Sequence, residues 1–127
     1  MKIIDATPIG TQLQAFEFVQ LNERMSVREV IRARIYQEVT DWNQSQSLEF
    51  SGLVQPTDTE NTLNGYKLKK RRTINWKEQY TRALDAFGRN GFFILIGDRQ
   101  VEDLDEIYDV GPETEISFVK LMPLVGG

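Results

Sequence analysis

The chain contains no cysteine and no histidine among its 127 residues. Without cysteine it has no thiol nucleophile, no disulfide and no thiolate metal ligand of its own. Without histidine it lacks the usual general base near neutral pH and the commonest metal ligand in proteins. Catalysis would have to rely on serine, threonine, lysine, tyrosine or carboxylate groups. We therefore predict that the chain is not an enzyme and has no catalytic residue, metal site or bound cofactor.

Long apolar runs are also missing. No stretch approaches the roughly 20 apolar residues that span a bilayer. Residues 1–5 lack the charged region and the long apolar region of a signal peptide. We expect a cytoplasmic protein without a membrane partner. The net charge of −4 lacks the excess of basic residues typical of nucleic-acid binding, so we expect no nucleic-acid partner either.

The first third of the chain predicts a hairpin followed by a helix. Its composition, 40% hydrophobic and 27% charged, is that of an ordinary globular domain, and we treat residues 1–127 as one domain. Two β-leaning segments flank a Pro-Ile-Gly turn signal and predict an antiparallel hairpin, with strands at Lys2–Thr7 and Gln14–Leu21. Ser26 and Glu29 form a capping box before a stripe of apolar residues at helical spacing. This pattern predicts a helix from about Val27 to about Asp41.

Residues 43–90 are interpreted as an insertion. Up to Thr73 the segment is rich in Ser, Gln, Asn, Thr and Gly, and a loop of that length without structure is unusual. We expect a small hairpin made from Leu48–Val54 and Tyr66–Lys69. Asn75 is a helix cap, and a second helix is predicted from about 76 to 87. Its apolar stripe is interpreted as core and consists of Trp76, Tyr80, Ala83, Leu84 and Phe87.

The last third predicts two strands around a short element. Phe92–Ile96 is a continuous apolar run typical of a central strand. Val101–Gly111 has room for a short strand or a single turn, and Glu115–Val119 alternates as the last strand. The order of elements favours an α+β fold with one main helix on a mixed sheet and the first and last strands side by side. That arrangement is the ubiquitin-like β-grasp, here with an insertion that carries a second helix.

The chemically distinctive segment is the tail, residues 120–127, which ends in Gly126-Gly127. A Gly-Gly end arises by chance in about 0.5% of chains if glycine makes up about 7% of residues, and here it follows a predicted strand almost directly. To become an acyl donor, the terminal carboxylate must reach a nucleotide through a narrow channel of a partner enzyme. Glycine backbone can enter such a channel, where side chains would clash. Ordering it costs roughly 1–2 kcal/mol per residue, so binding energy must come from the folded body and from contacts at Pro123, Leu124 and Val125.

From Ile94 to Gly127 the chain resembles ubiquitin-like proteins. The shared features are the strand, Gly97, the acidic segment at Gln100–Asp103, the turn with Tyr108, the last strand and the Gly-Gly end. The segment Glu115–Val119 and the tail are also similar to the small subunit of molybdopterin synthase and the thiamine-pathway sulfur carrier. The insertion has no counterpart in the minimal members, and a bacterial ubiquitin-like modifier would fit it.

The resemblance implies a Rossmann-like activating enzyme that uses ATP and magnesium to adenylate Gly127. The adenylate is then conjugated to a target protein, which implies a conjugating enzyme and a deconjugating protease. Alternatively it becomes a thiocarboxylate in a sulfur carrier and passes sulfur to an acceptor. A third alternative, from a different class, is a noncatalytic β-grasp interaction module with an incidental Gly-Gly end. The larger body favours conjugation.

Three surface features complete the sequence predictions. The first feature is a predicted docking face for the activating enzyme. It assumes that the main helix covers Phe93, Leu95, Ile116 and Phe118, so that the apolar residues between them point outward: Ile94, Ile96, Val119 and Leu121. The alternative is that the insertion covers these residues. The basic cluster Lys67–Arg72 is interpreted as a solvated loop, with an acid-contacting patch as the alternative. The acidic residues from Asp98 to Asp109 lack the spacing of a calcium loop, so we predict no metal site there.

Overall fold

The computed structural model describes residues 1–18, 22–62 and 65–121. Its contacts divide the chain into two compact units. The first unit contains the described parts of 1–30 and 87–121, and the second those of 31–86. Each helix begins in one unit and ends in the other. The protein is α+β, with a mixed sheet and two helices.

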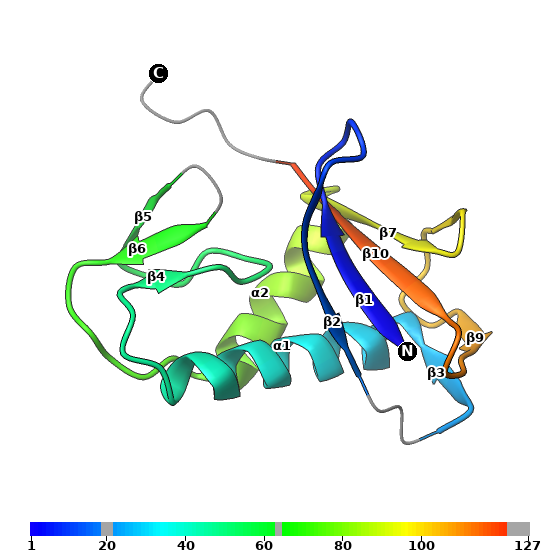
Figure 1. The fold of residues 1–127 in the computed structure, drawn as a ribbon, viewed down its shortest axis with the longest axis horizontal. Helices are drawn as coiled ribbons and strands as arrows, with labels where there is room; N and C mark the ends of the chain where they lie inside the picture. Colours follow the sequence, from blue (N-terminus) through cyan, green and yellow to red (C-terminus); the bar gives the residue numbers. More distant parts are fainter. Residues whose placement is uncertain (19–21, 63–64, 122–127) are drawn as a thin grey trace. The chain divides into compact units, whose positions relative to one another are not determined.

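The first unit is built on a five-stranded sheet with the order β2–β1–β10–β7–β8 (Figure 1). Its strands are β1 (Lys2–Ala6), β2 (Gln12–Glu17), β7 (Phe92–Ile96), β8 (Arg99–Val101) and β10 (Glu115–Lys120). β1 and β10 pair in parallel, whereas the other neighbouring pairs are antiparallel. The predicted neighbourhood of the first and last strands is therefore confirmed.

The predicted hairpin is also confirmed, with one difference. The second strand begins at Gln12, two residues earlier than predicted, because the register shifts between Asp5 and Ala6. Such a bulge lets the strand continue past an extra residue. The described part of this strand ends at Glu17, and residues 19–21 lie outside the description. Gly97 joins β7 to β8 with φ +64°, a conformation that glycine adopts without steric cost.

One side of the sheet forms the core of the first unit. Its most deeply buried residues are at most 2% exposed: Ile3, Phe92, Ile94, Val101, Ile116 and Phe118. The Phe92 ring lies 6.1 Å from the Phe118 ring and 5.8 Å from the Phe87 ring, both tilted. Tilted aromatic pairs of this kind add stability beyond the area they bury. We call this side the inner face.

A two-stranded sheet and the start of the first helix complete this unit. β3 (Arg24–Ser26) pairs antiparallel with β9 (Ile107–Asp109), so the predicted short element is a strand. α1 (Val27–Asn43) follows β3 directly. The Ser26 hydroxyl accepts a hydrogen bond from the Glu29 amide at 3.1 Å, and the Ser26 amide donates to the Glu29 carboxylate at 3.4 Å. The predicted capping box is confirmed.

The second unit combines the helices with a small antiparallel sheet, ordered β4–β6–β5. Its elements are β4 (Glu49–Phe50), β5 (Thr59–Asn61), β6 (Tyr66–Leu68) and α2 (Trp76–Gly88). The predicted pairing of two segments is confirmed by β4 and β6, but β5 was not foreseen. The Asn75 side chain accepts from the amides of Lys77 and Glu78 at 2.9 and 3.2 Å, so the predicted cap of α2 is also confirmed.

Polar side chains occupy part of the interior of the second unit. Arg34 is fully buried, and its Nε donates to the Glu38 carboxylate at 3.1 Å. The other carboxylate oxygen of Glu38 accepts from the Leu53 amide at 3.1 Å. Gln79 is 1% exposed and donates to the Val54 carbonyl at 3.1 Å. These bonds satisfy groups that would otherwise be costly to bury.

The predicted apolar stripe of α2 is partly wrong. The buried face of the helix runs through Gln79, Ala83 and Phe87, whereas Trp76, Tyr80 and Leu84 are only half-buried. The stripe is rotated because a backbone carbonyl partner makes Gln79 suitable for the interior. In the described residues, neither helix combines the length and the apolar character needed to cross a membrane.

Candidate functional site

The predicted reactive tail lies outside the described residues. This applies to Gly126 and Gly127 and to the predicted tail contacts Pro123, Leu124 and Val125. The described chain extends to Leu121, the residue that follows β10. The candidate site is therefore the part of the first unit around the end of β10.

The register of the sheet identifies which side chains share a face. Ile94 on β7 pairs with Phe118 on β10, and directly paired residues point to the same side. Both are fully buried, so the prediction that Ile94 points outward is wrong. Ile96 pairs with the buried Ile116 and is itself half-buried, so the prediction that Ile96 points outward is also wrong. The run Phe92–Ile96 is apolar at every position, so the sequence shows no alternation that would tell which of its side chains face the core.

At the end where β10 finishes, the opposite side of the sheet is apolar and half-exposed. Val119 pairs with Ala6 on β1 and with Phe93 on β7, and all three are half-buried. At the same end of the sheet, Leu121 is 45% exposed and Ile9, in the β1–β2 turn, is 90% exposed. We call these five residues the outer face. Of the predicted docking residues, Val119 and Leu121 belong to it.

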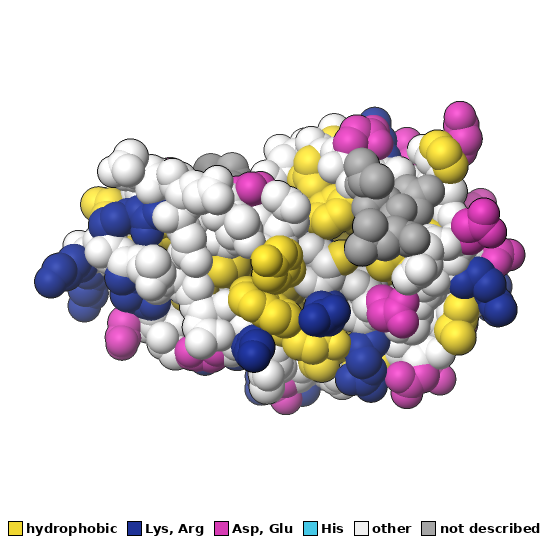
Figure 2. All heavy atoms as spheres, turned by 90° about the horizontal axis from the view of Figure 1, so that it is seen from below, with side chains coloured by type: hydrophobic (Ala, Val, Ile, Leu, Met, Phe, Trp, Pro, Cys, Tyr) yellow, Lys and Arg dark blue, Asp and Glu magenta, His cyan; other side chains and the backbone are white. Residues whose placement is uncertain are grey.

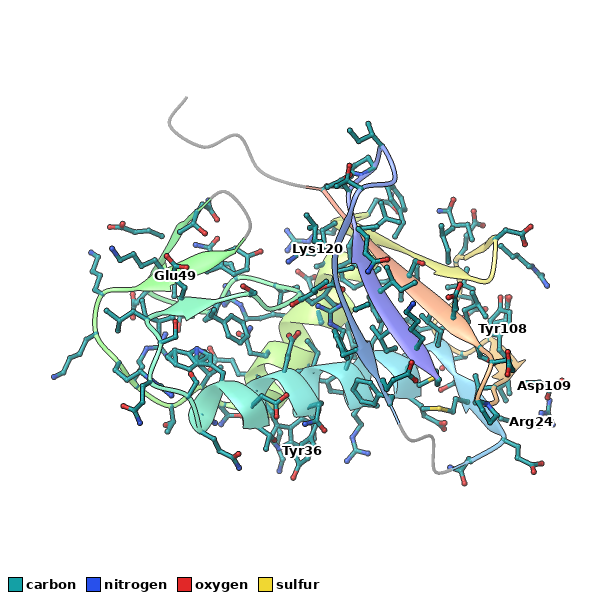
Figure 3. The ribbon with its side chains drawn as sticks, viewed as in Figure 1. Arg24, Tyr36, Glu49, Tyr108, Asp109 and Lys120 are labelled. Atoms are coloured by element: carbon teal, nitrogen blue, oxygen red, sulfur yellow. The ribbon has the colours of Figure 1, made fainter. Side chains whose placement is uncertain are left out.

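A buried charge lies beside the point where the tail begins. Lys120, the last residue of β10, is 6% exposed, and Asp5 on the neighbouring strand is fully buried. Asp5 pairs with Phe118, so alternation places both charged residues on the inner face. The Gln14 amide donates to the Asp5 carboxylate at 2.6 Å. Figure 3 labels Lys120, which stands at the end of β10.

Acidic side chains gather around β3 and β9, where arginines partly neutralise them. Their ion pairs are Arg24–Asp109 at 3.6 Å, Arg28–Asp105 at 3.3 Å and Arg99–Glu106 at 3.9 Å. Figure 3 shows Arg24, Tyr108 and Asp109 at this end of the unit. Partial burial raises the pKa of the Tyr108 hydroxyl above its ordinary value, and the hydrogen bond to the Glu106 carboxylate is the second cause in the same direction. No group of three or more carboxylates among the described residues is arranged to hold a metal ion.

The basic cluster Lys67–Arg72 has two roles in the second unit. Arg71 is structural: its guanidinium stacks on Trp42 at 3.3 Å from the ring centre and donates to the Ser45 carbonyl at 2.7 Å. Leu68 is buried, and Arg72 donates to the Thr57 carbonyl. The three lysines are exposed, as expected for a solvated surface.

An aromatic patch on the second unit was not foreseen. Tyr36 on α1 is 52% exposed, and its ring meets Trp76 edge-on at 5.3 Å. Trp76 also lies 6.4 Å from Tyr80, and the Arg32 guanidinium lies 5.3 Å above the Trp76 ring. We call Tyr36, Trp76 and Tyr80 the aromatic patch. Arg32 and Tyr36 are four apart on α1, and Trp76 and Tyr80 are four apart on α2, so the sequence groups each pair but does not bring the two pairs together.

An open hollow lies next to Trp76. It measures about 470 Å³ and is lined by Asn43, Thr73, Ile74, Asn75, Trp76 and Lys77. The side chain of Asn43 connects two parts of its lining: its Nδ2 donates to the Ile74 carbonyl at 3.1 Å, and its Oδ1 accepts from the Ile74 backbone N–H at 2.8 Å. The hollow is open to solvent, so it suits a side chain of a partner better than an enclosed small ligand.

None of the family models, curated proteins or solved structures compared with this chain matches it.

Proposed function

We propose that the chain is a ubiquitin-like modifier of β-grasp fold, whose C-terminal Gly126-Gly127 carboxylate is activated by a partner enzyme. The observation that carries the proposal is the parallel pair of β1 and β10 inside the mixed sheet. A last strand beside the first strand is one of the features on which the prediction of a β-grasp from the sequence depends. It makes β10 an interior strand, bonded on both sides, from which the chain continues towards Gly127.

The reach of the chain supports this role. The seven residues from Leu121 to Gly127 span at most about 24 Å when extended. That length allows a terminal carboxylate to enter a nucleotide site of another protein while the folded body stays outside. The hydrogen bonds of β10 to both neighbours hold the base of the tail against the body.

The chemistry requires no catalytic group from this chain. A carboxylate oxygen of Gly127 attacks the α-phosphorus of ATP, pyrophosphate leaves, and an acyl-adenylate forms. A cysteine thiolate of a partner enzyme then attacks the acyl carbon, and AMP leaves. A target amine or hydroxyl finally displaces the thiolate. The partner supplies ATP, magnesium and the thiol, so the absence of cysteine and histidine from this chain is compatible with the role.

The outer face is the proposed recognition surface for the activating enzyme. Exposed apolar surface marks interaction sites in soluble proteins, and this face lies at the end of β10 from which the tail continues. It replaces the predicted docking face, because Ile94 is buried. Recognition and reaction are then assigned to different residues of one chain.

The decisive experiment is ATP–pyrophosphate exchange with a candidate adenylating enzyme encoded in the same genome. Exchange should depend on this protein and should disappear when Gly127 is deleted. A deletion variant that supports exchange as well as the parent would reject the proposal. A Lys70→Ala variant, altered at an exposed lysine far from the tail in sequence, serves as a matched control and should behave like the parent.

Intact mass of the protein from its native host tests the terminus and separates the two outcomes of activation. A species ending at Gly127, joined to a second protein, supports the modifier. Replacement of one terminal oxygen by sulfur identifies a sulfur carrier instead. A host protein with no form that ends at Gly127 would exclude both.

A further inference from the structure

The aromatic patch carries a feature that the proposed function does not use. Tyrosine, tryptophan and arginine are the residues that contribute most to protein–protein interfaces, and here they lie together on the surface. Figure 3 shows Tyr36 projecting outward from α1. On the face in Figure 2, hydrophobic side chains gather with Lys and Arg side chains among them. Arg32 and Lys77 provide positive charge beside Trp76.

The first unit offers the complementary surface. The acidic segment, residues 102–109, contains five carboxylates and no basic residue. Three of these carboxylates pair with Arg24, Arg28 and Arg99, and the five negative charges still exceed the three positive ones. Within it, the aliphatic side chain of Ile107 is 54% exposed. An exposed aliphatic anchor between carboxylates is what an aromatic surface edged by cations can recognise.

The distribution of charge over the chain agrees with this pairing. The first unit contains six Lys and Arg and twelve Asp and Glu, a net charge of −6. The second contains nine Lys and Arg and seven Asp and Glu, a net charge of +2. Two copies can therefore attract each other through unlike units, while contact between two first units is repulsive.

We propose that the aromatic patch of one copy binds the acidic segment of a second copy. Ile107 of the second copy packs against Tyr36 and Trp76, and carboxylates beside Ile107 face Arg32 and Lys77. Because the two surfaces differ, the contact is head-to-tail and leaves one free surface of each kind at the ends of an open assembly. The interaction does not involve the tail and is independent of the proposed activation.

Sedimentation velocity of the full chain over a range of concentrations tests the proposal. The average mass of the parent should rise with concentration, and the rise should weaken when salt is increased from about 0.05 to about 0.5 M. Tyr36→Ser and Ile107→Asp should each weaken association by at least about tenfold. Both side chains are more than half exposed, so folding should be retained, which thermal unfolding checks. A second patch variant, Lys77→Glu, should weaken association in the same way without removing apolar surface.

Mixing the variants gives the sharpest result. Tyr36→Ser lacks the patch and Ile107→Asp lacks the anchor, so a mixture retains one intact contact and should form a one-to-one dimer and nothing larger. Removal of residues 122–127 should leave association unchanged. A parent that stays monomeric at all concentrations overturns the proposal. So does a mixture that stays monomeric while the parent associates, or association that survives both substitutions.

Discussion

Several interior positions of this protein are polar, and hydrogen bonds satisfy the ones described next. In the second unit, Gln79 donates to the Val54 carbonyl and Glu38 receives bonds from Arg34 and the Leu53 amide. In the first unit, Gln14 donates to the buried Asp5. Removing one partner of a buried pair leaves the other desolvated and unsatisfied, which costs more than the bond itself contributes. The stability of this protein should therefore depend strongly on a few polar residues.

Substitution of Gln79 tests this dependence. Gln79→Ala removes the donor to Val54 and leaves a small cavity, so the free energy of unfolding should fall by about 2 kcal/mol. Gln37→Ala is the matched control, because Gln37 donates to Asp41 on the exposed face of α1. Its effect should stay within about 0.5 kcal/mol. Urea unfolding followed by tryptophan fluorescence measures both, and equal effects would contradict the structural role of Gln79.

A second prediction concerns alkaline pH. Burial raises the pKa of the Tyr66 hydroxyl above its ordinary value of 10.0, and the negative charge of Glu38 is a second, smaller cause in the same direction. Below about pH 10 the tyrosine is neutral in both states and has no effect. Above that pH the unfolded chain ionises first, so the free energy of unfolding falls until the pH passes the folded-state pKa.

Tyr66→Phe removes this contribution. Between about pH 9 and about pH 11, its free energy of unfolding should fall less steeply than that of the parent. Tyr108→Phe should act in the same direction, because the pKa of Tyr108 is also raised. Urea unfolding at several pH values gives the slopes. A parent and a Tyr66→Phe variant with parallel pH dependence would refute the prediction.

Sequence reasoning failed at the buried charged residues for a definable reason. Arg34 follows Val27, Val30 and Ile31 at helical spacing, so its position lies on the buried face of α1. Lys120 likewise follows Ile116 and Phe118 at period two. The periodicity was visible, but charged side chains are rarely buried, so the sequence analysis assigned neither residue to the core. Only the three-dimensional partners of such groups explain why they are inside.

At the scale of elements, sequence predicted helices better than strands. Helix ends have local signals, and the bonds of Ser26, Glu29 and Asn75 match them. β5 has no such signal, because Thr59–Asn61 is a short polar segment whose strand exists only through its pairing with β6. The phase of β7 was wrong for a related reason, since a run without alternation does not reveal which face is buried.

The C-terminal end of α1 illustrates how one element stabilises another. α1 extends to Asn43, two residues beyond the predicted end. Arg71, after β6, donates to the carbonyls of Trp42 and Ser45, at and just beyond the end of α1, where helix carbonyls lack partners within the helix. Its positive charge also interacts favourably with the helix dipole at this end.

Arg71→Lys should lower the free energy of unfolding by about 1–3 kcal/mol. Lysine keeps the charge but loses the planar group that stacks on Trp42 and the several fixed donors. Lys70→Ala, at the neighbouring exposed position, should change stability by less than about 0.5 kcal/mol. Thermal and urea unfolding compare the two. Equal and small effects would show that the basic cluster acts only as a solvated surface.

At the scale of the whole molecule, the α+β class, the neighbourhood of the terminal strands and the presence of strands and a helix within residues 43–90 could be predicted from the sequence. The outer face could be predicted only in part. Val119 and Leu121 were correctly separated from the buried residues, whereas Phe93 was placed on the wrong side. The contribution of Ile9 depends on its position in the β1–β2 turn, beside the end of the sheet. Such a surface joins residues that are distant in sequence, so only the pairing of strands identifies it.

The proposed division between a recognising body and a reacting tail makes a kinetic prediction. In ATP–pyrophosphate exchange, replacing both Ile9 and Leu121 by alanine should raise the KM for this protein by about tenfold and leave kcat nearly unchanged. The substitutions remove exposed apolar contacts and leave the tail glycines intact. Leu48→Ala, which removes an exposed aliphatic side chain from the second unit, should leave both constants unchanged. A fall in kcat without a change in KM would mean that these residues act on the reacting group itself, and an unchanged KM would assign recognition to another surface.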